Sequence, residues 1–174
     1  MRDEYRELWG DIPIVLCSEE NYLGPQETYT KKQAIATADR TPLTQLADPY
    51  NMVLLYSNLY LDENIQLICH IVPEIKKFIF IGDARQINQT NNLDIRNKLK
   101  KTHPNVEYQF ITPQDMTTNQ LLDSLYFVDP KTTGVLFSSW FYKTTFAGNT
   151  SLVSNAHKLI GTTAAPIFLS LIHI

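Results

Sequence analysis

The stretch 61-LDENIQLICHIVPEIKKFIFIGD-83 decides the fold. Up to Pro73, its apolar residues recur at the spacing of an amphipathic helix, and a proline ends such a helix. The run Lys77–Ile81 that follows is almost wholly apolar and stops at Gly82 and Asp83. A short apolar run closed by glycine indicates a buried strand, of the kind found in parallel sheets whose two faces are both covered.

The same helix–strand unit recurs further along the chain. Helical patterns cover residues 93–99, 117–126 and 149–160, and strand patterns cover residues 106–111, 134–137 and 166–168. Such alternation predicts an α/β fold, a doubly wound parallel sheet between two helical layers (three-layer αβα). The carboxyl ends of the strands then share one edge, where the ligands of such sheets bind.

The first sixty residues follow a different pattern. Two apolar strands are predicted at residues 12–16 and 52–56, and the polar stretch 21–48 between them reads as a long loop with one or two helical turns in 31–38. Two strands cannot bury a sheet of their own. We therefore expect a fragment with a partial first lobe over residues 1–58, a second lobe over 59–168 and a non-native tail over 169–174.

Composition excludes several classes of protein. The chain has 174 residues and a net charge of −3, so it lacks the basic character that nucleic-acid binding requires. A 44% hydrophobic fraction excludes global disorder. The N-terminus, residues 1–6, is charged and does not resemble a signal peptide, and no run of about 18 apolar residues occurs, so from the residues alone we expect a cytoplasmic protein. The sequence is compatible both with a disulfide between Cys17 and Cys69 and with two free thiols.

No motif for a cofactor, a metal or covalent catalysis is present. Neither type of glycine-rich phosphate loop occurs, and no histidine has a histidine or cysteine partner at the spacing of a zinc site. Ser138 and Ser139 follow a strand, where a serine serves as a nucleophile or as polar lining of a cleft, but no G-x-S-x-G elbow surrounds them. We expect no cofactor, no metal and no catalytic residue.

Polar and aromatic residues that follow the predicted strands are the candidate ligand-binding set. Hydroxyl and charged groups would orient a small polar solute, and aromatic rings would give it apolar contact. Arg85 suits a solute carboxylate or else lies at the surface, and Trp140 contacts solute or else packs at the rim of the sheet. The set consists of Ser18, Glu19, Tyr22, Asp83, Arg85, Ser139 and Trp140.

Several segments, taken in order, resemble one family. Segments of type I periplasmic-binding-protein-like domains are similar to residues 11–15, to the stretch from 62–67 through 72–81, and to residues 135–141 and 165–168. Within this group, these residues are closest to the ABC-transporter-substrate-binding-like sensor domains of membrane histidine kinases, often hybrid ones. The resemblance spans residues 10–168.

The resemblance implies an extracytoplasmic domain of a two-component histidine kinase. Two lobes would close on a small solute about a hinge at residues 56–61 and bias a signalling element. The resemblance places the domain on the periplasmic side of the inner membrane, attached only through flanking segments. It is compatible with a monomer and with a homodimer. The alternatives are a solute-binding protein of an ABC transporter and a cytoplasmic α/β hydrolase or transferase.

Overall fold

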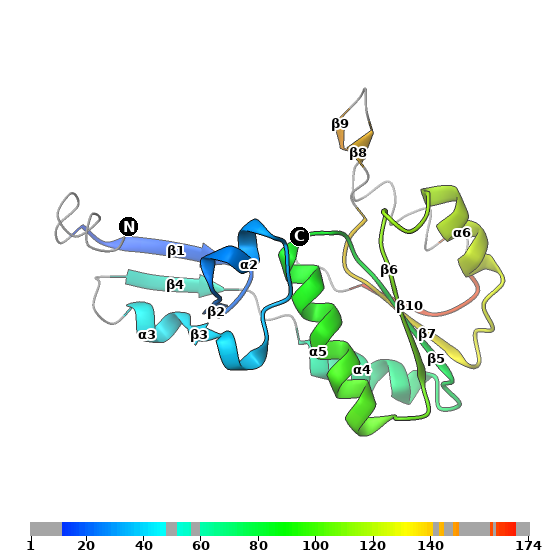
Figure 1. Ribbon diagram of the computed structural model, residues 1–174. Helices are drawn as coiled ribbons and strands as arrows, with labels where there is room; N and C mark the ends of the chain where they lie inside the picture. Colours follow the sequence, from blue (N-terminus) through cyan, green and yellow to red (C-terminus); the bar gives the residue numbers. More distant parts are fainter. Residues whose placement is uncertain are drawn as a thin grey trace.

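A computed structural model describes residues 12–47, 52–56, 60–140, 143–144, 148–149, 161 and 163–169. Figure 1 shows a two-stranded sheet at one side of the molecule and a larger sheet flanked by helices at the other. No helix among the described residues is both long and apolar enough to cross a bilayer.

The larger sheet has four parallel strands. Their order across the sheet is β10-β7-β5-β6, so β5, the first in sequence, lies inside the sheet and the chain moves outward from it in both directions. This confirms an α/β fold built on a parallel sheet. The strands are β5 (Lys77–Ile81), β6 (Glu107–Ile111), β7 (Thr133–Phe137) and β10 (Ile167–Leu169).

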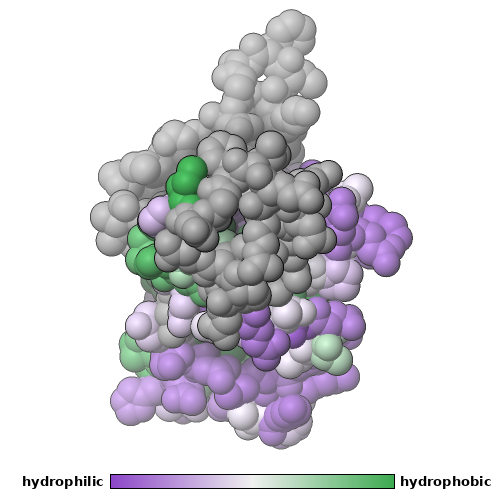
Figure 2. Space-filling model, turned by 90° about the vertical axis from the view of Figure 1, so that its left-hand side faces the viewer, coloured by the Kyte–Doolittle hydropathy of each residue, from purple (hydrophilic) through white to green (hydrophobic). Residues whose placement is uncertain are grey.

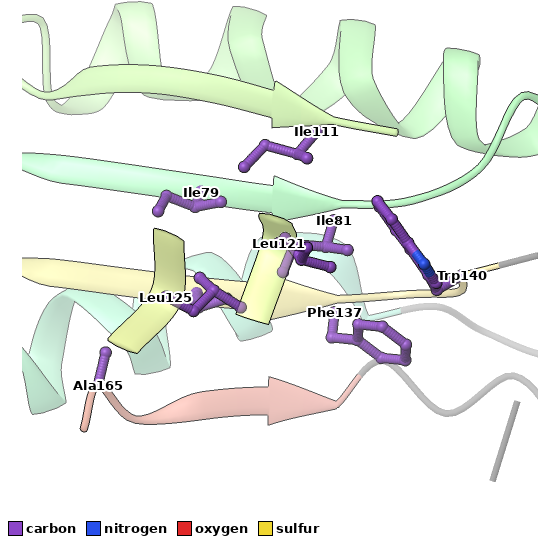
Figure 3. Close-up of a cluster of buried hydrophobic side chains, with 9 residues drawn as sticks. Ile79, Ile81, Ile111, Leu121, Leu125, Phe137, Trp140 and Ala165 are labelled. Carbon is purple, nitrogen blue, oxygen red and sulfur yellow. The ribbon is translucent and has the colours of Figure 1, made fainter. Parts of the chain in front are cut away.

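Helices cover both faces of this sheet. On one face, α4 (Leu61–Ile71) and α5 (Gln86–Thr102) bury a cluster that includes Ile68, Phe80 and Leu136. On the other face, α6 (Thr118–Tyr126) packs on Ile79, Phe137 and Trp140, as Figure 3 shows. Alternate residues of each strand feed opposite clusters because successive side chains of a strand point to opposite faces.

Helix α5 begins earlier than the sequence pattern predicts. The helix predicted over residues 93–99 is present, but its predicted start is too late, because α5 already starts at Gln86 and runs to Thr102. Its first two turns are rich in Asn, Gln and Thr, which favour helices weakly and hide the helical period. Asn88, Thr90 and Asn91 are nevertheless buried there, so tertiary contacts of polar groups hold these turns.

Gly134 in β7 lies directly under α4. A Cβ added at Gly134 would overlap Cγ2 of Ile68, which is fully buried and has no room to move. We expect Gly134→Ala to lower the free energy of unfolding by about 1–3 kcal/mol through overpacking. Urea unfolding measures this change, and Gly161→Ala is the control because a Cβ there meets nothing within 4 Å. An equal loss in both variants would contradict the packing of α4 on β7.

The two-stranded sheet joins β1 (Ile14–Ser18) to β4 (Met52–Tyr56) in parallel. Val15, Val53 and Leu55 are each more than half exposed, so nothing in the described part of the chain covers that face of the sheet. Figure 2 faces this side of the molecule and shows hydrophobic surface (green) above a mainly hydrophilic lower part (purple).

The polar stretch 21–48 is more structured than the sequence pattern predicts. A short antiparallel pair and several helical turns replace the expected loop, and residues 31–38 contain a turn at Lys31 and Lys32 and the start of a 3₁₀ helix at Thr37. The buried side chains Ile35 and Leu43 hold the stretch together. Its elements are β2 (Tyr22–Leu23), α2 (Gln26–Thr30), η1 (Thr37–Asp39), β3 (Thr41–Pro42) and α3 (Leu43–Ala47).

Two smaller predictions concern the helix over residues 149–160 and the disulfide between Cys17 and Cys69. The helix predicted over residues 149–160 falls almost entirely outside the described residues, whereas β8 (Lys143–Thr144) and β9 (Gly148–Asn149) form a short antiparallel pair just before it. Cys17 and Cys69 are both free thiols, so the structure contains no disulfide between them.

Candidate ligand-binding site

The carboxyl edge of the sheet has a topological switch point between β5 and β7. The chain leaves β5 through α5 to reach β6 on one side, while β7 lies on the other, so the direction of winding changes at this point. Ligands of open α/β sheets bind outside the strand ends at such a point. Asp83 follows β5 here, and Ser138 and Ser139 follow β7.

Asp83 is the centre of a buried hydrogen-bond network at this edge. Ser139 Oγ donates to Asp83 Oδ2 at 2.7 Å, and Asn88 Nδ2 donates to Asp83 Oδ1 at 2.9 Å. Arg85 binds the same carboxylate through its backbone N–H at 2.8 Å and through Nε, which lies 3.0 Å from each oxygen. Asp83 is only 2% exposed, so the network fixes a negative charge inside the edge of the sheet.

Asn88 connects the two strand ends through the first turn of α5. Its Nδ2 also donates to Ser139 Oγ at 2.8 Å, and its Oδ1 accepts from Ser138 Oγ at 2.9 Å. Gly82 makes room for this amide, because a Cβ at Gly82 would lie 3.1 Å from Asn88 Cγ. The side chain of Asn88 therefore lies between the two strand ends and joins α5 to both strands.

The charges of the network are set by these contacts. Burial by itself would raise the pKa of Asp83, but the hydrogen bonds from Ser139, Arg85 and Asn88 outweigh it and lower that pKa below its ordinary value. The side chain of Arg85 is 40% exposed, whereas that of Asp83 is 3% exposed. The arrangement thus holds a guanidinium in a fixed position at the surface of the edge, with a buried carboxylate behind it.

A second polar group lies at the end of β1. Tyr22 donates its hydroxyl proton to Glu20 Oε1 at 2.7 Å, and the backbone N–H of Glu20 donates to Ser18 Oγ at 3.1 Å. The guanidinium of Arg40 stacks on the ring of Tyr22, with Cζ 4.7 Å from the ring centroid. Burial raises the pKa of Glu20, and the hydrogen bond from Tyr22 only partly opposes that shift.

This second group is attached to α5. Arg40 Nη2 donates to Asp94 Oδ1 at 2.7 Å, and both side chains are less than one third exposed. The backbone N–H of Ile35 donates to Thr90 Oγ1 at 3.0 Å, and the carbonyl of Ile35 accepts from Arg40. The segment from Tyr22 to Arg40 is therefore docked on the helix that also carries Asn88.

The structure divides the sequence-predicted site residues into three places. Asp83, Arg85 and Ser139 meet in the network at the sheet edge. Ser18 and Tyr22 belong to the group at the end of β1, and Glu19 lies half-buried next to them in the chain. Trp140 is fully buried in the cluster under α6, where Nε1 donates to Thr118 Oγ1 at 3.0 Å.

Four further residues complete these two groups. Asn88, Glu20, Arg40 and Asp94 are absent from the predicted set. Asn88 falls in turns that the sequence pattern does not recognise as helical, and Arg40 falls in the stretch that reads as loop. Asp94 lies in the predicted helix 93–99 but away from any strand end. Two local signals were available: Glu20 is among the residues that follow the first predicted strand, and Asn88 lies five residues after a strand-end aspartate.

A large hollow in the described part of the molecule lies elsewhere. It encloses about 830 Å³ beside Arg40 and Asp94, between η1, the start of α4 and the outer side of α5, and its lining includes Thr37, Tyr60, Asp62, Asp94, Lys98 and Lys101. Most of these side chains are exposed, and Lys98 pairs with Asp62 at 2.7 Å. We assign more weight to the sheet edge, because buried groups define its geometry.

Neither the placement of metal-ligating side chains in the described residues nor comparison with known proteins assigns a function to the site. Among the described residues, no three His, Cys, Asp or Glu side chains come together to hold a metal ion. Comparison of the chain with protein-family models, with curated proteins and with solved structures finds no match. The geometry of the two polar groups is thus the basis for a functional proposal.

Proposed function

We propose that the chain is a small-solute-binding sensor domain with its site at the carboxyl edge of β5 and β7. The observation that carries the proposal is the buried network of Asp83, Asn88 and Ser139, which holds the partly exposed side chain of Arg85 in place. A guanidinium oriented in advance recognises a carboxylate without first losing the entropy of its own side chain. The solutes it suits best therefore carry a carboxylate.

Lobe closure is the mechanism that we propose for signalling. The segment carrying Tyr22 and Arg40 already contacts α5, so a solute at the edge of the sheet would change how the two parts of the molecule meet. A ligand shifts such an equilibrium only through its different affinities for the open and closed states. In this proposal the domain is extracytoplasmic and passes that shift to a histidine kinase.

The network also favours binding over covalent catalysis. Ser139 donates its proton to Asp83, and the groups that surround the pair are the amide of Asn88 and the guanidinium of Arg85. A carboxylate whose pKa lies below its ordinary value is a weak general base, and a serine nucleophile needs a base near neutral pKa. A hydrolase reading of Ser139 is therefore less well supported than a binding site.

A screen of solutes tests the proposal. We expect at least one amino acid or hydroxy acid to raise the melting temperature of the chain, because a ligand of the folded state stabilises it. Arg85→Gln should weaken that solute by about tenfold to a hundredfold, the value of a charge-assisted hydrogen bond. Isothermal titration calorimetry measures the affinity, and Lys101→Gln in the large hollow is the matched control.

The outcomes separate the two locations. Loss of affinity in Lys101→Gln with none in Arg85→Gln would move the site to the hollow beside α5. No stabilisation by any amino acid, hydroxy acid or sugar would reject solute binding altogether. Small-angle scattering with and without the bound solute then tests lobe closure, which requires a smaller radius of gyration in the complex.

A further inference from the structure

A second hollow lies between the outer turns of α5 and the edge strand β6. It encloses about 440 Å³, within the range of small-molecule sites. One wall is the face of α5 that carries Arg96 and Lys100, continued by His103 directly after the helix. The floor includes Tyr108 and Phe110 of β6. Neither the wall nor the floor shares a residue with the network around Asp83 or with the group around Arg40.

The charge of this hollow is entirely of one sign. Arg96, Lys100 and His103 follow one another at helical spacing, and no acidic residue is among those that line the hollow. Neither Arg96 nor Lys100 forms an ion pair with another described residue, whereas Lys98 on the same helix pairs with Asp62. Like charges at this spacing repel each other along a helix, and an anion between them removes the repulsion.

The aromatic floor is held in place before any ligand arrives. Tyr108 donates its hydroxyl proton to Asn92 Oδ1 at 2.8 Å, and the ring of Phe110 stacks on Phe80 with centroids 5.2 Å apart. Both floor residues are half-buried, so each keeps some ring surface accessible. A flat apolar group gains contact there without reordering side chains.

We propose that this hollow binds a small organic anion with a flat apolar body, such as an aryl phosphate or an aryl carboxylate. The anionic group pairs with Arg96 and Lys100, and the ring lies over Tyr108 and Phe110. Favourable interaction of cations with the carboxyl end of a helix is a simpler reason for basic residues in the last turn. That reason applies equally to Lys101, which does not line this second hollow, so Lys101 is the internal control.

The experiment uses the whole chain and phenyl phosphate, with titration followed by calorimetry. Inorganic phosphate supplies the anionic group alone, and benzyl alcohol supplies the ring alone. We expect phenyl phosphate to bind at millimolar or lower concentration and more tightly than either fragment. The double variant Arg96→Gln, Lys100→Gln should weaken it by about tenfold or more, since two charge-assisted contacts are lost. Lys101→Gln should stay within about twofold of the parent chain.

Each other outcome would overturn the proposal. Equal losses in the double variant and in Lys101→Gln would show diffuse attraction to a basic helix end. Inorganic phosphate binding as tightly as phenyl phosphate would exclude a role for the aromatic floor, and no binding of phenyl phosphate would exclude the site. Arg96 and Lys100 are exposed, so the double variant should melt no lower than the parent chain, which keeps loss of binding distinct from loss of folding.

Discussion

Replacing Asp83 by alanine is expected to destabilise the fold by roughly 2–4 kcal/mol, because buried donors lose their acceptor. Ser139 Oγ and Asn88 Nδ2 both donate to this carboxylate from positions that are almost fully buried. The first turn of α5 also loses an anchor, since the backbone N–H of Arg85 binds Asp83 Oδ1. Urea unfolding followed by circular dichroism measures the change.

An exposed carboxylate provides the matched control for Asp83. Asp129 accepts hydrogen bonds from the backbone N–H of Lys131 and the hydroxyl of Thr132, and both hydrogen bonds are exposed to solvent. We expect Asp129→Ala to cost much less stability than Asp83→Ala, because water replaces the lost partner. Equal losses in the two variants would mean that the Asp83 network is not a buried support of the sheet edge.

The Asp83→Asn variant tests the charge rather than the shape of the group. Because folding lowers the pKa of Asp83, its contribution to stability is complete above the ordinary carboxyl pKa of about 3.9 and disappears as the pH falls through the lower folded-state value. The parent chain should therefore lose more stability between neutral and acidic pH than Asp83→Asn does. Identical pH profiles would contradict a charged, hydrogen-bonded Asp83.

Local sequence patterns predict the larger sheet and its helices well. β5 is Lys77–Ile81, as the apolar run predicts, and α4 ends at Ile71, just before Pro73. Helix α6 has Thr117 as its N-cap, in a capping box with Gln120, and this short-range signal is visible in the chain. These elements are predictable because each is specified by residues within a few positions of one another.

The elements that the pattern misses depend on distant contacts. The first turns of α5 are held by Asp83, Ser139 and Ile35, and no period of apolar residues marks them. The segment around Arg40 is likewise held by Asp94, more than fifty residues away. Propensity and periodicity describe neighbours in sequence, so polar contacts between distant segments leave no pattern for them to detect.

The candidate site, like the fold, is only partly predictable from the sequence. Strand ends of a parallel sheet meet at one edge, so Asp83, Arg85 and Ser139 could be grouped from topology alone. Asn88 joins them through a helical turn that the pattern does not predict, and Tyr22 is linked to α5 through Arg40. The rule of strand ends finds the region of the site but not the side chains that connect its parts.

Replacing Trp140 by alanine is expected to cost about 3–5 kcal/mol, which is the range for deleting a large buried aromatic side chain. The indole is fully buried among Ile81, Leu121 and Phe137, and Figure 3 shows it at the carboxyl end of the strands under α6. The cavity left behind would lie between the sheet and the helix, where neither can collapse without breaking other contacts. Phe127→Ala is the control, because that ring is 83% exposed and should change stability by less than about 0.5 kcal/mol.

The milder change Trp140→Phe separates packing from solute contact. It keeps an aromatic ring in the cluster but removes the N–H that binds Thr118 Oγ1, so we expect a loss of about 1–2 kcal/mol of stability. Because the indole is buried, the affinity for a solute found in the screen should stay within about twofold of the parent chain, a change of under 0.5 kcal/mol. A tenfold loss of solute affinity in Trp140→Phe, with Arg85→Gln unaffected, would instead make Trp140 a solute contact and displace the site from Arg85 toward α6.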